Sequence, residues 1–91
     1  SDGTPVIQIQ GGFVFEVNRA FRETYQGLPT GRPVIVDLSK ADYIDSAGLG
    51  MLIRLREHAG NRKDSVTITG TNSTVRTILD VANFGNLFQI T

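Results

Sequence analysis

Residues 34–50 read VIVDLSKADYIDSAGLG, and this stretch decides the fold. It begins with an apolar run at residues 34–38, which is typical of a buried β-strand, and then turns through a polar bend. An acid and a hydroxyl, Asp45 and Ser46, precede two closely spaced glycines and a helical pattern over residues 51–59. This order predicts that Ser46 lies where a helix begins. Such a position favours an anion, because free backbone N–H groups and the helix dipole point toward it.

The rest of the chain alternates predicted strands and helices. The strand at residues 34–38 is apolar almost throughout, which favours a central strand covered on both faces. Strands that alternate with helices predict an α/β fold, in which three main helices pack on a mostly parallel or mixed sheet of four or five strands. The other predicted elements are strands at residues 6–10 (ended by Gly11-Gly12), 66–69 and 87–90, a helix at 16–25, and a helix that starts at Asn72 or Ser73.

Length and composition predict one folded domain that spans residues 1–91. Hydrophobic residues make up 40% and charged residues 20%, as in an ordinary globular protein. Nine basic and nine acidic side chains give a formal net charge of zero, which argues against a broad electrostatic attraction to nucleic acid or anionic lipid. No apolar run approaches the roughly 20 residues that cross a bilayer. Cysteine is absent, and we therefore expect a cytoplasmic protein without disulfides.

The central helix is predicted to have one buried face and one face open to a partner. At about 100° per residue, Leu49 and Ile53 fall on the flank that carries Ser46 and Gly50, where two aliphatic side chains beside a hydroxyl form a small apolar patch. Alternatively, Leu49 and Ile53 belong to a broader buried arc, which would draw Arg56 into the core. The residues predicted to face the core are Gly48, Met51, Leu52, Leu55 and Ala59.

Ser46 is not predicted to be a catalytic nucleophile, and we expect no enzyme. The nucleophile-elbow pattern needs glycine two residues before the serine, where this chain has Ile44. The single histidine, His58, would lie about 18 Å along the same helix, whereas a general base must lie about 3 Å from the hydroxyl. One histidine without cysteine also argues against a transition-metal site, and no cofactor is expected. Basic residues near the helix end alternate with acidic ones and are predicted to form a solvated face: Arg54, Arg56, Arg62 and Lys63.

The segment YIDSAGLG at residues 43–50 resembles the signature of the STAS domain, the fold of bacterial anti-sigma factor antagonists. In that family, Asp-Ser-Ser/Ala-Gly-Leu-Gly leads from a strand and a short loop into a helix. The resemblance extends to a glycine after the first strand, to a helix around residues 19–25 and to the ending NFGNLF at residues 83–88. The family usually has a further short strand before the one predicted here at residues 6–10. With only five residues before Val6, the resemblance leaves the presence of that strand open.

The resemblance implies a regulatory switch that acts by exchange of protein partners. The unphosphorylated protein would bind an anti-sigma factor or serine kinase and so regulate transcription. Phosphorylation of Ser46 would end this binding, and a matching phosphatase would restore it. The residues expected to contact the partner are Asp45, Ser46, Leu49, Gly50 and Ile53.

Other functions remain open for this family. The domain would alternatively regulate a membrane transporter for anions or lipids, through a separate partner that spans the membrane, or it would bind a nucleotide. At the level of single residues, the Ser46 hydroxyl is alternatively a cap of its own helix. Asp45 either satisfies N–H groups at the helix start or orients Ser46 toward a kinase.

Overall fold

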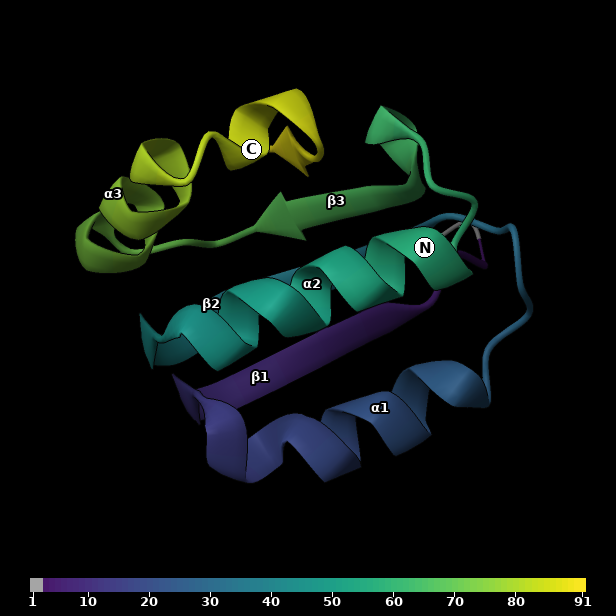
Figure 1. Ribbon diagram of the computed structural model, residues 1–91, viewed down its shortest axis with the longest axis horizontal. Coiled ribbons are helices and arrows are strands. Elements are labelled where there is room, and N and C mark those ends of the chain that lie inside the picture. Colours follow the sequence, from purple (N-terminus) through teal and green to yellow (C-terminus); the bar gives the residue numbers. More distant parts are fainter. Residues whose placement is uncertain (1–2) are drawn as a thin grey trace.

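The computed structural model describes residues 3–91, which form one α/β unit (Figure 1). Short 3-10 turns join some of the main elements, at Phe15–Val17, Lys63–Ser65 and Phe84–Asn86. The strands and helices follow in the order β1 (Val6–Phe13), α1 (Asn18–Gln26), β2 (Val34–Ile44), α2 (Ser46–His58), β3 (Val66–Thr69), α3 (Ser73–Val81) and β4 (Gln89–Ile90).

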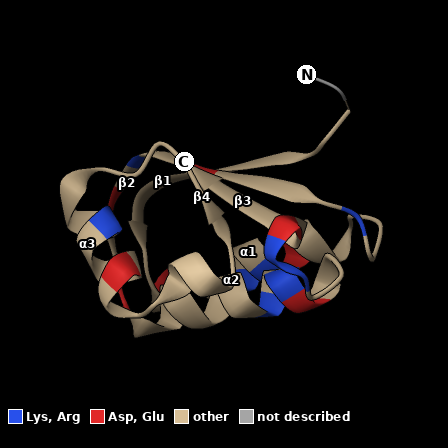
Figure 2. Cartoon of the chain, turned by 90° about the horizontal axis from the view of Figure 1, so that it is seen from above, with Lys and Arg blue, Asp and Glu red and all other residues tan. Residues whose placement is uncertain are grey.

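The four strands of the described chain form one sheet in the order β1-β2-β3-β4, and every neighbouring pair is parallel. Right-handed crossovers between successive parallel neighbours carry each connecting helix to the same face. The helices accordingly lie on one side of the sheet (Figure 2). The predicted α/β fold with three helices is confirmed, and its sheet is parallel rather than mixed.

The expectation that both faces of residues 34–38 are covered is wrong. Val34, Val36 and Leu38 are buried beneath the helices, whereas Ile35 and Asp37 point to the opposite face and are only half-buried. Ile35 lies between Val6 of β1 and a threonine of β3 in the strand register. One aliphatic residue on the open face, partly shielded by its cross-strand neighbours, was enough to make the run look buried on both sides.

Strands β1 and β2 are longer than predicted, because the two pair along their whole length. β1 does not end at Gly11-Gly12 but continues to Phe13, which lies opposite Ile44. The register between β1 and β2 shifts at two places, between Gln8 and Gln10 and between Gly11 and Gly12. Gly11 adopts a φ of 76° at the second shift. Such bulges bend a strand without ending it. The predicted polar bend after residue 38 is therefore part of β2.

The core lies between the sheet and the helices. Phe13 at the end of β1 makes an edge-on contact with Phe21 of α1, with ring centroids 4.9 Å apart, and Phe21 contacts Tyr25 in the same way at 5.6 Å. Asn72 caps α3 by accepting a hydrogen bond from the backbone N–H of Val75 at 2.7 Å. The largest fully buried side chains are Phe13, Phe88, Leu38, Ile44, Leu52, Leu55, Ile68 and Leu79, with Val34, Val36, Val66 and Val75.

The described residues before Val6 form no further strand, so β1 pairs with β2 alone within this part of the chain. The free edge of β1 faces α1, and side chains of both elements line a shallow groove there. The further strand that the resemblance left open is thus not found among residues 3–5.

Candidate functional site

The candidate site is the junction between β2 and α2, and Asp45 holds it in place. Asp45 is the N-cap of α2: its Oδ1 accepts a hydrogen bond from the backbone N–H of Gly48 at 2.9 Å. Its Oδ2 accepts another from the backbone N–H of Phe15 at 3.3 Å, and its own N–H donates to the carbonyl of Phe13. One carboxylate therefore ties the start of α2 to the end of β1. Of the two cap assignments that the sequence left open, Asp45 rather than Ser46 fills the role.

Ser46 is the first residue of α2, and its side chain is exposed. Because Asp45 satisfies the Gly48 N–H, the Ser46 hydroxyl is not needed to cap the helix. It makes no hydrogen bond with any residue that the structure describes. The hydroxyl thus lies in solvent beside the positive end of the helix dipole, where an added negative charge is tolerated.

Gly48 is required by the close approach of two elements. A Cβ built at Gly48 would overlap the carbonyl oxygen of Phe13 and the side chain of Ile44. The first turn of α2 therefore rests directly on the end of β1, and Gly48 faces the core as predicted. Gly50 is different: nothing lies within 4 Å of a Cβ built there, and the residue is exposed.

The outward stripe of α2 consists of Ser46, Gly50, Ile53 and Glu57, all of which are exposed. Ile53 is the exposed large aliphatic residue of this stripe, with 37% of its surface accessible. Leu49 is half-buried and packs against the core cluster. Of the two aliphatic residues predicted to form a partner patch, the structure thus presents Ile53 outward and turns Leu49 partly inward. All residues predicted to face the core are buried.

Phe15 is an exposed aromatic residue that the sequence analysis did not single out. Phe15 is 66% exposed, and its backbone N–H donates a hydrogen bond to Asp45, the residue next to Ser46. Three apolar residues follow Gly11-Gly12, and only Phe13 is fully buried. That run of three apolar residues was the available signal, because consecutive side chains near a strand end cannot all face one core.

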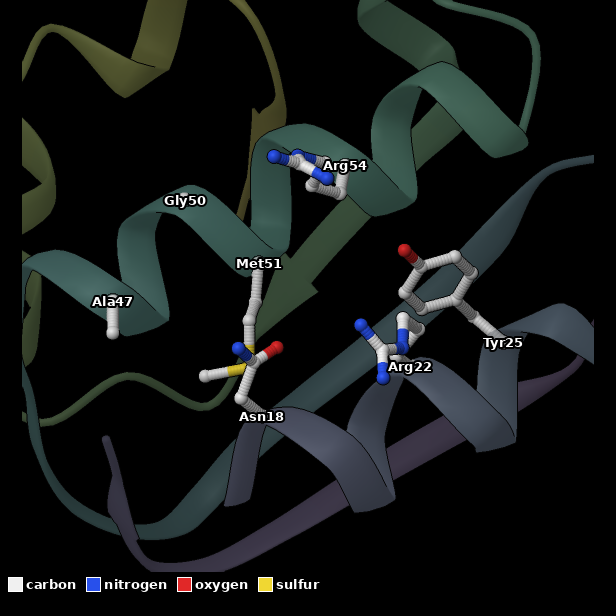
Figure 3. A pocket seen from close by; sticks show the side chains of 7 residues that line it. All are labelled: Asn18, Arg22, Tyr25, Ala47, Gly50, Met51 and Arg54. Atoms are coloured by element: carbon white, nitrogen blue, oxygen red, sulfur yellow. The ribbon is translucent and has the colours of Figure 1, made fainter. Parts of the chain in front are cut away.

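A hollow of about 290 Å³ lies between α1 and α2, beside the outward stripe (Figure 3). Arg22 and Tyr25 extend from α1 toward α2, and Arg54 lies on α2 (Figure 3). Neither arginine forms an ion pair or a hydrogen bond with any described residue. The full lining, called the α1–α2 pocket below, is Asn18, Arg22, Tyr25, Ala47, Gly50, Met51 and Arg54.

Arg56 near the end of α2 is less solvated than predicted, and the neighbouring His58 also makes packing contacts. Arg56 is half-buried: its Nε donates to the carbonyl of Leu87 at 2.8 Å, and its Nη1 donates to the side chain of Asn61. The ring of His58 packs against Tyr25, and its Nε2 lies 2.9 Å from the carbonyl oxygen of Leu28. These contacts anchor loops on either side of α2, so the prediction of a uniformly solvated basic face is wrong.

Asp37 lies on the open face of the sheet. Its Oδ1 accepts a hydrogen bond from the backbone N–H of Ser39 at 2.9 Å, and its Oδ2 accepts one from Gln8 at 3.2 Å. The hydrogen bonds from Ser39 lower the pKa of the Asp37 carboxyl below its ordinary value of 3.8, and Gln8 and the charge of Lys40 act in the same direction. This role is structural, and the residue is not part of the α2 junction.

Comparison with known proteins shows the family to which these features belong. The family described as "Mlab, STAS domain" matches residues 1–89. A STAS-domain containing protein of Pseudomonas aeruginosa (strain UCBPP-PA14) is 44% identical over 85 residues, which are 92% of this chain and 84% of that protein. The chain belongs to the STAS-domain family.

Two solved structures have the same fold. A sulfate transporter family protein from Wolinella succinogenes superposes with a TM-score of 0.75 at 19% identity, covering 97% of this chain and 78% of that chain. The anti-sigma factor antagonist SpoIIAA in its unphosphorylated form gives a TM-score of 0.61 at 21% identity, covering 92% and 76%. At these identities the similarity concerns the arrangement of strands and helices.

No helix among residues 3–91 combines the length and the apolar character needed to traverse a bilayer. In the same part of the chain, no three His, Cys, Asp or Glu residues come together in a way that would hold a metal ion.

Proposed function

We propose that this protein is a non-enzymatic regulatory STAS module, an anti-sigma factor antagonist that binds an anti-sigma factor or serine kinase and is switched off by phosphorylation of Ser46. The single observation that carries this proposal is the exposed, unbonded hydroxyl of Ser46 at the start of α2, within a fold that SpoIIAA shares. A kinase needs a serine that it can reach, and a switch needs that serine to be dispensable for folding. Both conditions hold at Ser46, because Asp45 supplies the cap.

Phosphorylation would change binding without unfolding the domain. A phosphate adds about −1.5 to −2 charges, and the N-terminus of α2 tolerates them because of its free N–H groups and its dipole. The same charge would lie on the outward stripe, one helical turn from Gly50 and beside the Asp45 carboxylate. A partner docked on Gly50 and Ile53 would have to desolvate the phosphate, at a cost of several kcal/mol, which lowers affinity by about a hundredfold or more.

The proposed contact surface is the outward stripe together with its margins. Ser46, Gly50 and Ile53 face solvent, and Asp45 with the half-buried Leu49 completes the set. The exposed ring of Phe15 extends this surface beyond α2. A matching phosphatase would restore binding, in a cycle that regulates transcription in the bacterial cytoplasm.

A second candidate function is regulation of a membrane transporter through a separate partner. It is favoured by the similarity to the Wolinella succinogenes protein, whose description places it in a sulfate transporter family. The same α2 surface would serve, with a transporter subunit as its partner. Recovery of the protein with a membrane complex rather than with a kinase or an anti-sigma factor would support this function.

The test is affinity capture from the native host with Ser46→Ala and Ser46→Asp as baits, combined with mapping of phosphorylated residues. We expect Ser46→Ala to retain an anti-sigma factor or kinase, and Ser46→Asp to fold normally but lose it. The matched control is Ser73→Asp, since Ser73 is also the exposed first residue of a helix, α3, that another side chain caps. Equal capture by Ser46→Asp and wild type would contradict the switch.

A further inference from the structure

The α1–α2 pocket is a cationic site without an internal anion. Its lining includes two guanidinium groups, Arg22 from α1 and Arg54 from α2, and no carboxylate. Neighbouring arginines have partners: Arg19 pairs with Glu23 at 3.1 Å, and Arg56 donates to a backbone carbonyl. Two unpaired guanidinium groups that border one hollow make it attractive to an anion such as a carboxylate.

The hydroxyl of Tyr25 is a further polar group available in the pocket. Tyr25 is 8% exposed, and its ring is held by Phe21 and His58. Its hydroxyl makes no hydrogen bond with any residue of the described chain, and the oxygen is open to the pocket rather than buried. In Figure 3 the oxygen points from α1 toward α2. It can therefore donate a hydrogen bond to a ligand oxygen in the pocket.

The geometry points to an acidic segment of the protein partner as the occupant: a carboxylate side chain of that segment enters the α1–α2 pocket and is held by Arg22, Arg54 and the Tyr25 hydroxyl. This inference rests on the proposed function, and it specifies that the contacting segment of the partner is acidic. Charge complementarity favours a carboxylate, because the lining carries two cations and no anion.

The position of the pocket favours a protein ligand over a small anion. Gly50 belongs both to the pocket lining and to the outward stripe, so the pocket is continuous with the proposed contact surface. A partner that lays an apolar side chain on Ile53 can therefore place an acidic one in the pocket. Two acidic residues lie near: Glu57 follows Arg54 by one turn of α2, and Glu23 is already paired with Arg19. Neither lines the pocket.

The same arrangement explains why a charge on Ser46 would oppose binding. Ser46 precedes Gly50 by four residues, about 6 Å along the helix axis. That distance is shorter than the Debye length of about 8 Å at physiological ionic strength, so the repulsion is only partly screened. A phosphate there would repel an incoming carboxylate and attract the Arg54 guanidinium.

The test uses hexaglutamate peptide as the acidic probe, with hexaglutamine as the neutral control at matched ionic strength. Nitrogen-15 NMR would follow the Arg Nε–H signals and the Gly50 amide of the full chain. We expect saturable shifts at Arg22, Arg54 and Gly50 with hexaglutamate and none with hexaglutamine. Arg22→Gln and Arg54→Gln should each lower the affinity for hexaglutamate about tenfold, corresponding to the loss of one charge-assisted hydrogen bond.

Two further variants test whether the loss of affinity is specific to the pocket residues. Arg32→Gln removes the same charge at an exposed residue outside the pocket, and it should change the affinity less than about twofold. Tyr25→Phe should lower the affinity for hexaglutamate about threefold, since it removes only a hydrogen bond from an uncharged donor. Spectra that keep their dispersion would show that each variant is folded.

Three outcomes would overturn the inference: shifts spread evenly over the surface, an equal loss in Arg32→Gln, or displacement of the peptide by ATP, GTP or inorganic phosphate at lower concentration. The last would make the pocket a small-anion site. None of these readouts involves a phosphorylated Ser46 or the native partner. Peptide binding together with a failed Ser46 capture experiment would therefore refute the proposed function alone.

Discussion

Two glycines at the start of α2 have opposite surroundings. Gly48 faces the carbonyl of Phe13, and Gly50 faces solvent. We expect Gly48→Ala to lower the free energy of unfolding by about 3 kcal/mol, because a methyl group would force α2 away from β1. Gly50→Ala should leave stability unchanged or raise it by up to about 1 kcal/mol, as alanine favours a helix more than glycine does. Urea denaturation of both variants checks this, and equal losses would contradict the close approach at Gly48.

At the same scale, Asp37 predicts a pH dependence. Its pKa is lowered in the folded protein, so the folded state binds its proton less tightly than the unfolded state does. The stability from this carboxylate is therefore fully present above the ordinary pKa of 3.8, and it is lost as the pH falls through the lower pKa of the folded state. We expect the urea midpoints of wild type and Asp37→Asn to converge in this acid range. A constant gap down to the lowest pH at which both variants fold would refute the assignment.

At the scale of the element, the aliphatic residues Leu49 and Ile53 of α2 have different roles: one packs against the core and the other faces solvent. Ile53 is 37% exposed, whereas Leu49 packs against the core cluster. We expect Ile53→Lys to weaken partner binding by about tenfold or more with little change in melting temperature. Leu49→Lys should instead cost about 2 kcal/mol of stability, because it places a charge at the margin of the core.

Thermal denaturation and a binding assay on the same two variants separate these roles. The outcome that would refute the division is a large stability loss for Ile53→Lys. In that case the aliphatic flank of α2 would be core throughout, and the partner surface would have to lie on Phe15 and the α1–α2 pocket.

The elements also show what the sequence could and could not predict. The start of α2 at Ser46 followed from the order of acid, hydroxyl and glycines, and its buried face followed from helical periodicity. Side-chain chemistry limited the α3 cap to Asn72 or Ser73, and the structure shows Asn72 in that role. The extension of β2 to Ile44 did not, because it depends on pairing with β1, which no local pattern contains. The same holds for the Asp45 bond to Phe15, which joins residues 30 positions apart.

Site residues were predictable only where the pattern is local. The YIDSAGLG segment located Ser46 and Gly50, and the structure shows both exposed on one stripe. The α1–α2 pocket was missed, since Arg22 and Arg54 lie on different helices and meet only in the fold. Arg56 was misassigned for a related reason: its partner Leu87 lies in a distant loop.

At the scale of the whole molecule, the sheet predicts a gradient of local stability along β2. Ile35–Asp37 pairs with β1 on one side and β3 on the other, whereas Lys40–Ile44 pairs with β1 alone. Amides with two paired neighbours and a helix above them open least often. We expect hydrogen exchange to be slowest on average in the first half of β2 and faster in the second, with the two residues of β4 among the fastest. Uniform protection along β2 would contradict the pairing.

The placement of all three helices on one side of the sheet has a practical consequence for following the protein in solution. The reverse side carries Val6, whose side chain is 54% exposed in the same register row as Ile35. The chain contains no cysteine, so Val6→Cys would create a unique thiol for a fluorescent dye. Such a label would report tumbling and complex formation from the side of the sheet opposite α2, and it would leave the docking surface chemically untouched.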